Sequence, residues 1–283
     1  KRLKSMIVPL PPLKEQKRIV EKIEEILPYI DAYAEAWSKL EKINNSFPED
    51  IQKSLIQYAI EGKLVEQREE EGTAEELFKQ IQLERKELIK QGKIKKEKPL
   101  PKITEEDIPF EIPNSWKWVR IGEIFSHSAG KPLNSSDKEG KQHPYITTSN
   151  VYWNEFALDD LKTMYYTDNE IEKCSAKKGD LLVLEGGDIG RAAIWNYDYD
   201  IRIQNHIHRL RPLTGVDVNL FYYIFFLYKT LNLIEGRGIG LQGLSAKRLK
   251  SMIVPLPPLK EQKRIVKKLE ELLPLCDQLK LQK

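Results

Sequence analysis

Apolar residues recur at alternating intervals of four and three along the first part of the chain. The series consists of Ile19, Ile23, Ile26, Ile30, Tyr33, Trp37 and Leu40. This heptad spacing places one apolar stripe along a helix, as in a coiled coil, although an ordinary core helix carries a similar stripe. It predicts a helix from about Lys14 to Ser46, roughly 50 Å long. Pro28 points away from the stripe, so we expect a kink there rather than the end of the helix.

Two further helices are expected before the first hundred residues end. The segment "PEDIQKSLIQYAI" predicts a helix that begins at Pro48 and ends before Gly62. The segment "TAEELFKQIQLERKELIKQG" predicts another, with Thr73 as N-cap, Glu76 in the capping-box position and Gly92 as the stop signal. The basic, proline-containing segment "KIKKEKPLPK" then indicates a linker.

From about Pro109 the helical periodicity fades, and β-branched and aromatic residues alternate with Gly and Asn. Four segments favour strands: "WKWVRIGEIFSHS", "HPYITTSNVYW", "GDLLVLEGGDIGRAAIW" and "IRIQNHIHRLRPL". The apolar segment "DVNLFYYIFFLYKTLNLI" favours a buried helix. Residues 103–246 are therefore predicted to form an α+β domain on an irregular, mostly antiparallel sheet, flanked by long antiparallel coiled-coil helices.

The stretch "KRLKSMIVPLPPLKEQKRIV" occurs twice, at residues 1–20 and at 247–266. Over 31 positions from each start, 26 residues are identical. A repeat separated by a whole domain is no solenoid and indicates a tandem duplication. We therefore expect residues 1–102 to be one helical region and 247–283 the start of a second.

The second copy repeats the apolar stripe, at Ile265, Leu269, Leu272, Cys276 and Leu279. We expect its helix, from about Glu261, to pack antiparallel on the Lys14–Ser46 helix through the two stripes. Pro274, like Pro28, is expected to kink its helix.

Composition excludes several classes of protein. No apolar run approaches the length of about twenty residues that spans a membrane, and two cysteines form no disulfide framework, so we expect a cytoplasmic protein. The net charge is +3 for the chain, but residues 103–246 hold 15 Lys and Arg against 20 Asp and Glu. Any nucleic-acid contact of this domain would need a local patch.

Motifs for catalysis are weak. The Gly-rich "GRGIG" at 236–240 follows a helix instead of a strand and lacks the acidic residue of a nucleotide site. His206 and His208 have no convincing third ligand, so a packed or hydrogen-bonded pair is favoured over a metal site. We find no nucleophile elbow, phosphate loop or methyltransferase motif, which favours binding over catalysis.

Polar loops of the domain carry amides, hydroxyls and isolated cations, although each alone also suits an ordinary turn. Asn and Gln pair with adenine and Arg and Lys with guanine, while hydroxyls and Gly amides hold phosphates. The candidate DNA-binding residues are Lys131, Thr148, Asn150, Arg191, Asn205, His206 and Gln242.

The chain resembles the DNA specificity subunits of type I restriction–modification systems over essentially its whole length. The motifs, in the family's order, are "IVPLPPLKEQKRIV", "IQKSLIQYAIEGKLV", "AEELFKQIQLERKELIKQGKIKK", "IPNSWKWVRIGEI", "GDLLVLEGGDIGRAAIW" and "LSAKRLKSMIVPLPP". The family has two target recognition domains that alternate with two helical conserved regions. This sequence shows one recognition domain (103–246), one full conserved region and the start of another.

The resemblance implies a non-catalytic subunit whose recognition domain reads half of a split target in double-stranded DNA. The helices would set the spacing of the half-sites and dock methyltransferase subunits. S-adenosylmethionine, ATP and Mg would belong to the methyltransferase and restriction–translocase partners, and no cofactor or metal to this chain. A recognition domain is expected before Lys1, unless the chain is a half-size subunit that forms a homodimer. The alternatives are the DNA-recognition portion of a single-chain restriction–methylation enzyme and a coiled-coil tether without a DNA role.

Overall fold

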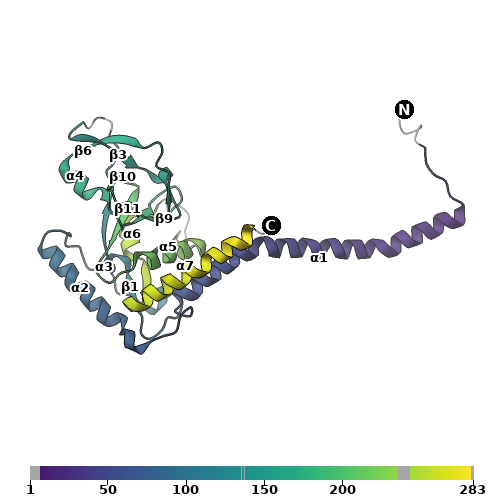
Figure 1. The fold of residues 1–283 in the computed structure, drawn as a ribbon, viewed down its shortest axis with the longest axis horizontal. Coiled ribbons are helices and arrows are strands. Elements are labelled where there is room, and N and C mark those ends of the chain that lie inside the picture. Colours follow the sequence, from purple (N-terminus) through teal and green to yellow (C-terminus); the bar gives the residue numbers. More distant parts are fainter. Residues whose placement is uncertain (1–6, 135, 137, 235–242, 282–283) are drawn as a thin grey trace.

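A single helix, α1 (Leu13–Ile60), projects as a rod from the rest of the protein (Figure 1). The computed structural model describes residues 7–134, 136, 138–234 and 243–281. The 48 residues of α1 correspond to about 72 Å. The predicted start of a separate helix at Pro48 is wrong, because α1 continues through this buried proline. The chain leaves the helix at Gly62, whose φ of +73° suits glycine and whose added Cβ would meet the Pro113 ring at 2.4 Å.

Helix α2 (Ala74–Lys90) follows the predicted signals. The Glu76 amide donates to Thr73 Oγ1 at 3.4 Å, and the Thr73 amide donates to Glu76 Oε2 at 3.2 Å, which completes the capping box. The 3₁₀ turns Glu69–Glu71 and Glu105–Asp107 precede and follow α2.

Two four-stranded sheets form the globular part, as the α+β prediction requires. The first, antiparallel throughout, has the order β2 (Phe125–Ala129), β11 (Ile207–Pro212), β8 (Leu181–Leu184), β9 (Ala192–Ile194). The second has the order β6 (Lys162–Tyr166), β3 (Lys141–Ile146), β10 (Ile201–Ile203), β7 (Ser175–Ala176), and its β3–β10 pair is parallel. Two small antiparallel pairs are β1 (Lys117–Arg120) with β12 (Ile253–Leu256), and β4 (Val151–Tyr152) with β5 (Glu155–Phe156). The sheet structure is therefore mostly antiparallel.

The remaining elements are short except for the buried helix predicted from its apolar sequence. They are α3 (Ile121–Ile124), the 3₁₀ turn Thr148–Asn150, α4 (Asp168–Lys173), α5 (Val218–Thr230) and α6 (Ala246–Ser251).

Strand β8 lies at the centre of the layers, which explains its continuous apolar run. Leu182 and Leu184 belong to the apolar cluster shared with the second sheet. Leu181 and Val183 point to the opposite side and belong to the cluster that contains helix α5. A strand with apolar residues on both faces is suited to a position between two layers.

Helix α7 (Leu259–Leu281) runs antiparallel beside the C-terminal part of α1 (Figure 1). Ile56, Ala59 and Ile60 of α1 are buried in the cluster that also holds Ile265 and Leu269 of α7. The expectation that α7 packs on the Lys14–Ser46 segment is wrong, because α7 packs on the later turns of α1 that hold Ile56, Ala59 and Ile60. Of the other predicted positions in α7, Cys276 is buried, Leu272 is half-buried and Leu279 is exposed.

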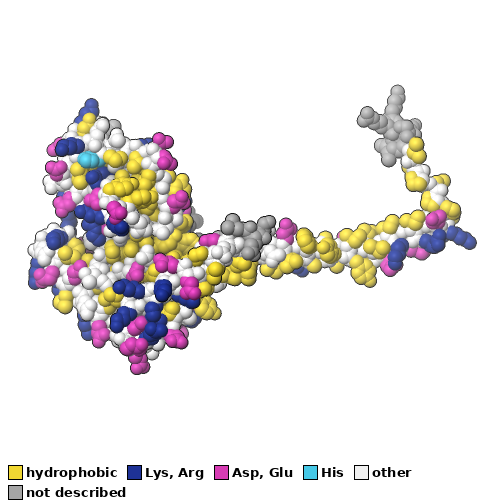
Figure 2. Space-filling view, viewed as in Figure 1, with side chains coloured by type: hydrophobic (Ala, Val, Ile, Leu, Met, Phe, Trp, Pro, Cys, Tyr) yellow, Lys and Arg dark blue, Asp and Glu magenta, His cyan; other side chains and the backbone are white. Residues whose placement is uncertain are grey.

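The stripe of α1 is uncovered over its N-terminal half. Figure 2 shows apolar side chains along the rod. Between 41% and 67% of the side chain is accessible at Ile19, Ile23, Ile26, Ile30, Tyr33, Trp37 and Leu40. The coiled-coil partner of these residues therefore stays a prediction.

One hydrophobic core crosses both predicted domain boundaries. It joins Ile81 of α2, Val119 of β1, Phe221 of α5 and Ile265 of α7. The predicted domain boundaries at 102/103 and 246/247 therefore stay predictions. In the structure, the shared hydrophobic core packs the three predicted segments into one body.

The two copies of the repeat allow a matched stability test. Leu269→Ala should lower the free energy of unfolding by about 2–5 kcal/mol, because Leu269 is fully buried. Ile23→Ala, at the equivalent position in the first copy, should change it by less than about 1 kcal/mol in dilute solution, because Ile23 is half-exposed. Urea unfolding measures both values, and equal costs would contradict the packing described.

Candidate nucleic-acid interface

The topology brings the predicted polar loops to one end of the two sheets. Residues 185–191 connect β8 to β9, and residues 204–206 connect β10 to β11, which pairs with β8. The β2 end joins them, because the Asn205 amide donates to the Lys131 carbonyl at 3.0 Å. The β3 end also joins them, because the Gln204 amide donates to the Ile146 carbonyl at 3.0 Å. We call residues 129–131, 147–153, 185–191 and 204–206 the loop rim.

Arg191 holds two loops of the rim together. Its Nε donates to Asp188 Oδ2 at 2.7 Å, and its Nη1 donates to the Val151 carbonyl at 3.2 Å. Its guanidinium lies over the Tyr152 ring, 5.3 Å from the centroid. Burial would raise the pKa of Asp188, but hydrogen bonds from Lys229 and Arg191 hold it below its usual value. Arg191 therefore fixes the position of Tyr152 as well as its own.

His206 is an exposed member of the rim, with 54% of its side chain accessible. Its Nδ1 lies 3.4 Å from Glu185 Oε2. The Glu185 amide donates to the His206 carbonyl, and the Leu244 amide donates to the Glu185 carbonyl, so the backbone fixes both residues. His206 can donate or accept a hydrogen bond, and Glu185 can accept one from cytosine N4.

Thr148 and Asn150 lie half-buried in one turn of the rim. Asn150 Oδ1 accepts from the Thr147 amide at 2.9 Å and from Thr147 Oγ1 at 2.8 Å. Asn150 Nδ2 donates to the Ala157 carbonyl at 2.9 Å. The amide of Asn150 is therefore engaged in shaping the turn.

The backbone of Lys131 lies in the loop rim, but its side chain points into the domain. Only 5% of the residue is accessible, and Nζ donates to Glu170 Oε2 at 2.7 Å and to the Tyr165 carbonyl at 2.9 Å. Hydrogen bonds from Lys131 and from the Thr167 amide lower the pKa of Glu170. The prediction that Lys131 contacts DNA thus does not fit its position. Asn205 is half-buried in the rim, and Gln242 lies outside the described residues.

Sequence patterns did not single out Tyr152 or Glu185. Tyr152 is 47% exposed beside Arg191 and offers a ring to a base or a sugar. Gly186 and Gly187 form the tip of the hairpin, where no heavy atom lies within 4 Å of an added Cβ. The exposed backbone amides of such a tip suit phosphate oxygens. In the sequence, the adjacent "GG" within an apolar strand pattern is the signal that indicates this hairpin tip.

A second histidine pair joins the neighbouring strands β2 and β11, with His208 buried and His127 half-buried. His127 Nε2 is 3.0 Å from His208 Nδ1, and His208 Nε2 is 2.6 Å from the Leu244 carbonyl. His208 therefore pairs with His127, and not with His206 as the sequence suggested. Among the residues that the structure describes, no group of three or more His, Cys, Asp or Glu side chains is placed to hold a metal ion.

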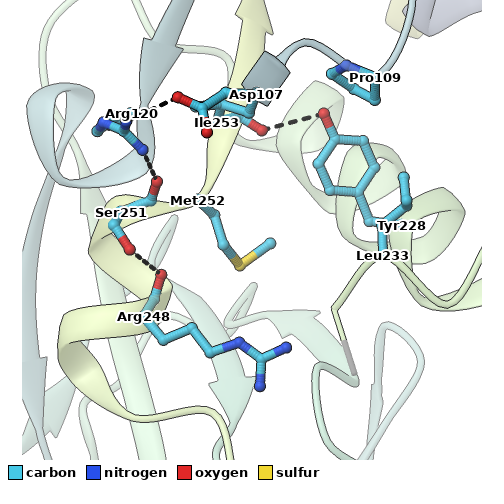
Figure 3. A pocket seen from close by; sticks show the side chains of 9 residues that line it. All are labelled: Asp107, Pro109, Arg120, Tyr228, Leu233, Arg248, Ser251, Met252 and Ile253. Atoms are coloured by element: carbon cyan, nitrogen blue, oxygen red, sulfur yellow. Dashed lines mark hydrogen bonds and ion pairs between the residues drawn. The ribbon is translucent and has the colours of Figure 1, made fainter. Parts of the chain in front are cut away.

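A hollow of about 370 Å³, none of whose lining residues belongs to the rim, lies between the linker, the end of α5 and the α6–β12 connection (Figure 3). Arg120 donates to the carbonyls of Pro101, Lys102 and Ser251. The Tyr228 hydroxyl donates to the Ile253 carbonyl at 3.1 Å. Because these groups already bind the protein, the hollow serves the junction of linker and repeat rather than a ligand.

None of the helices in the described ranges combines the length and apolar composition that crossing a bilayer requires.

Residues 113–283 match the family model described as "Type I restriction modification DNA specificity domain". This match covers more than half of the chain, and the chain belongs to this family of DNA specificity domains.

Relatives in Escherichia coli are similar across most of the chain. The EcoAI specificity subunit is 27% identical over 321 residues, which cover 96% of this chain and 54% of the relative. The EcoEI specificity subunit is 30% identical over 244 residues, which cover 81% of this chain and 41% of the relative. The chain thus spans about half the length of these relatives.

Solved structures share the fold. The HsdS subunit from Thermoanaerobacter tengcongensis superposes with a TM-score of 0.52 at 20% identity, covering 96% of this chain and 54% of that chain. A chain from a structure of the type I R-M system gives a TM-score of 0.52 at 21% identity, covering 96% and 55%. The arrangement of sheet domain and long helix is therefore the HsdS fold.

Lys131→Met tests whether this residue stabilises the domain instead of contacting DNA. We expect a loss of about 1–3 kcal/mol in unfolding free energy, because Glu170 keeps a charge that has lost its partner but is partly exposed. The control Lys162→Met, at an exposed position of β6, should change stability by less than about 0.5 kcal/mol. Lost DNA affinity without lost stability at Lys131 would contradict this assignment.

The pair of His127 and His208 predicts a pH dependence of stability. Burial and the neighbouring His208 lower the pKa of His127 from 6.5 to about 4. Between these values the unfolded chain binds more protons than the folded chain, so stability falls as pH drops from 6.5 to 4, by about 3 kcal/mol in all. His127→Phe should flatten this slope in urea unfolding, because it removes the imidazole whose pKa is lowered. A slope in His127→Phe equal to that of the unchanged protein would contradict the lowered pKa of His127.

Proposed function

We propose that this chain reads DNA sequence as part of a type I restriction–modification assembly. The observation that carries the proposal is the loop rim, where exposed Tyr152, His206 and the Gly186–Gly187 tip gather on a domain of this family. Arg191 and Glu185 hold these groups in place through hydrogen bonds to backbone and side chains. Groups fixed in advance lose little freedom when they contact bases.

The local charge of the rim favours base reading over strong phosphate attraction. Asp188 pairs with Arg191 and with Lys229 of α5, and Glu185 lies beside His206, so both acidic side chains of the rim offset its cations. Because non-specific binding comes mainly from phosphate neutralisation, we expect the chain alone to bind DNA weakly. Methyltransferase subunits would supply further DNA contacts.

The helical rod would set the distance between two half-sites. A rod of about 72 Å covers roughly two turns of DNA, and a helix is stiffer than a loop. The uncovered stripe of α1 would pair with a further helix of the assembly. The chain would perform no catalysis, and S-adenosylmethionine, ATP and Mg would be bound by the methyltransferase and restriction–translocase subunits in the cytoplasm.

A domain exchange tests this division of labour. Residues 103–246 are replaced by the equivalent segment of a related specificity subunit, and the assembled methyltransferase is supplied with random-sequence DNA. We expect one half of the methylated target to change, while the other half and the spacer length stay the same. A changed spacer, or an unchanged target, would contradict the proposal.

His206→Ala provides a finer test within the rim. Loss of a base contact should weaken binding of the cognate target by about 1–3 kcal/mol and leave non-cognate DNA unaffected. The matched control is His143→Ala, because His143 lies on β3 outside the rim. Equal losses on cognate and non-cognate DNA would show a phosphate contact in place of a base contact.

A further inference from the structure

The two carboxylates of the loop between β8 and β9 differ in their partners. Asp188 accepts from Arg191 Nε at 2.7 Å and pairs with Lys229 Nζ at 3.1 Å. Among the residues that the structure describes, the polar side-chain partner of Glu185 is His206, whose Nδ1 lies 3.4 Å from Oε2. The Glu185 side chain is 31% accessible, and an ionised carboxylate has about four acceptor positions. Glu185 therefore keeps the capacity to accept a further hydrogen bond.

The backbone holds Glu185 at the start of an uncrowded hairpin tip. Its amide donates to the His206 carbonyl at 3.0 Å, and its carbonyl accepts from the Leu244 amide at 2.8 Å. Gly186 and Gly187 follow, and no heavy atom lies within 4 Å of a Cβ added to either. Because glycines let another molecule approach the backbone closely, no side chain at the tip would hold Glu185 away from a base edge.

A carboxylate beside DNA is costly unless it meets a hydrogen-bond donor. The phosphates repel it, and it can only accept. The donors on base edges are amino groups: N4 of cytosine and N6 of adenine in the major groove, and N2 of guanine in the minor groove. A narrow minor groove concentrates negative potential and so disfavours a carboxylate. In the major groove, guanine and thymine present acceptor atoms, which the Glu185 carboxylate would repel.

Cytosine suits the Glu185 carboxylate better than adenine does. The N6 amino group of adenine stands beside N7, an acceptor that would face the same carboxylate. A side-chain amide matches that edge, because it donates to N7 and accepts from N6. The major-groove edge of cytosine presents its N4 donor without an acceptor on the same base. The chemistry of Glu185 therefore selects cytosine among the four bases.

We propose that Glu185 is a specificity-determining residue, which accepts a hydrogen bond from N4 of one cytosine in the major groove of the target. His206, with Nδ1 3.4 Å from Oε2, limits the directions in which the carboxylate can turn. The assignment rests on the proposed function, because it needs the loop rim to face DNA. It adds the chemical identity of one base that the rim selects.

Glu185→Gln tests the assignment, because it keeps the shape of the side chain and adds an amide donor. The assembled methyltransferase complex selects DNA from a random-sequence library, and sequencing gives the base preference at each position of the bound DNA. With the unchanged chain, one position should prefer cytosine by roughly 10- to 100-fold. In the variant this preference should fall about tenfold or more, with the other positions unchanged.

Glu155→Gln is the matched control, because it removes the same charge from an exposed residue of β5 outside the loop rim. This variant should keep the base preference at every position. A loss of the cytosine preference in both variants alike would show a general effect of charge and would overturn the assignment.

A second measurement uses the unchanged protein, so it does not depend on the folding of a variant. In a synthetic duplex of the selected target, N4-methylcytosine replaces the cytosine. Its methyl group takes the major-groove position of the N4 hydrogen, while the pair with guanine remains. The complex should bind this duplex about tenfold or more weakly, whereas the complex with Glu185→Gln should bind both duplexes within about twofold. Equal binding of both duplexes by the unchanged protein would overturn the assignment.

The outcomes separate the role of Glu185 from the proposed function. A complex that selects no DNA sequence would contradict the proposed function and, with it, the role of Glu185. A complex that selects a target would support DNA reading. If Glu185→Gln then left that target unchanged, or relaxed it at a position other than cytosine, only the assignment to Glu185 would be overturned.

Discussion

The short antiparallel pair of β1 and β12 joins the recognition domain to the helical rod. The buried carboxylate of Glu261 adds hydrogen bonds at the same junction. Glu261 is 1% exposed, and burial raises its pKa although Trp116 and Gln67 donate hydrogen bonds to it. A buried carboxylate is tolerated only where such donors satisfy it. The three residues come from the start of α7, the entry to β1 and the loop after α1. The contacts of Glu261 therefore help to hold the domain and both helices together.

In the proposed function, this junction would keep DNA reading by the loop rim separate from half-site spacing by the rod. The loop rim is built on ends of the two sheets, while the rod is built on α1 and α7, and the apolar core between them is continuous. A continuous core transmits the position of the rod to the rim without a flexible linker. Under the proposed function, the rim could then change in sequence while the junction and the rod keep their geometry.

Local sequence signals predicted helices and strands correctly where their formation depends on residues that are close together in the chain. The capping box at Thr73, the buried helix α5 and the apolar strand β8 follow from patterns within a few residues. The continuation of α1 through Pro48 did not follow, because packing of the buried ring outweighs the lost hydrogen bond. The inward turn of Lys131 depends on Glu170, 39 residues away in the chain, and the pairing of His208 depends on His127 of a neighbouring strand. The gathering of the loop rim was visible only in the sheet topology.

Native-state hydrogen exchange tests most directly whether the junction makes rod and domain one body. Amides of β1, β12 and the last four turns of α1 should open with one shared free energy, equal to that of global unfolding. Amides of α1 before Phe47 should exchange at a much lower free energy, because no described element covers that segment. Separate opening of the last turns of α1 while β1 and β12 stay protected would contradict a rigid junction.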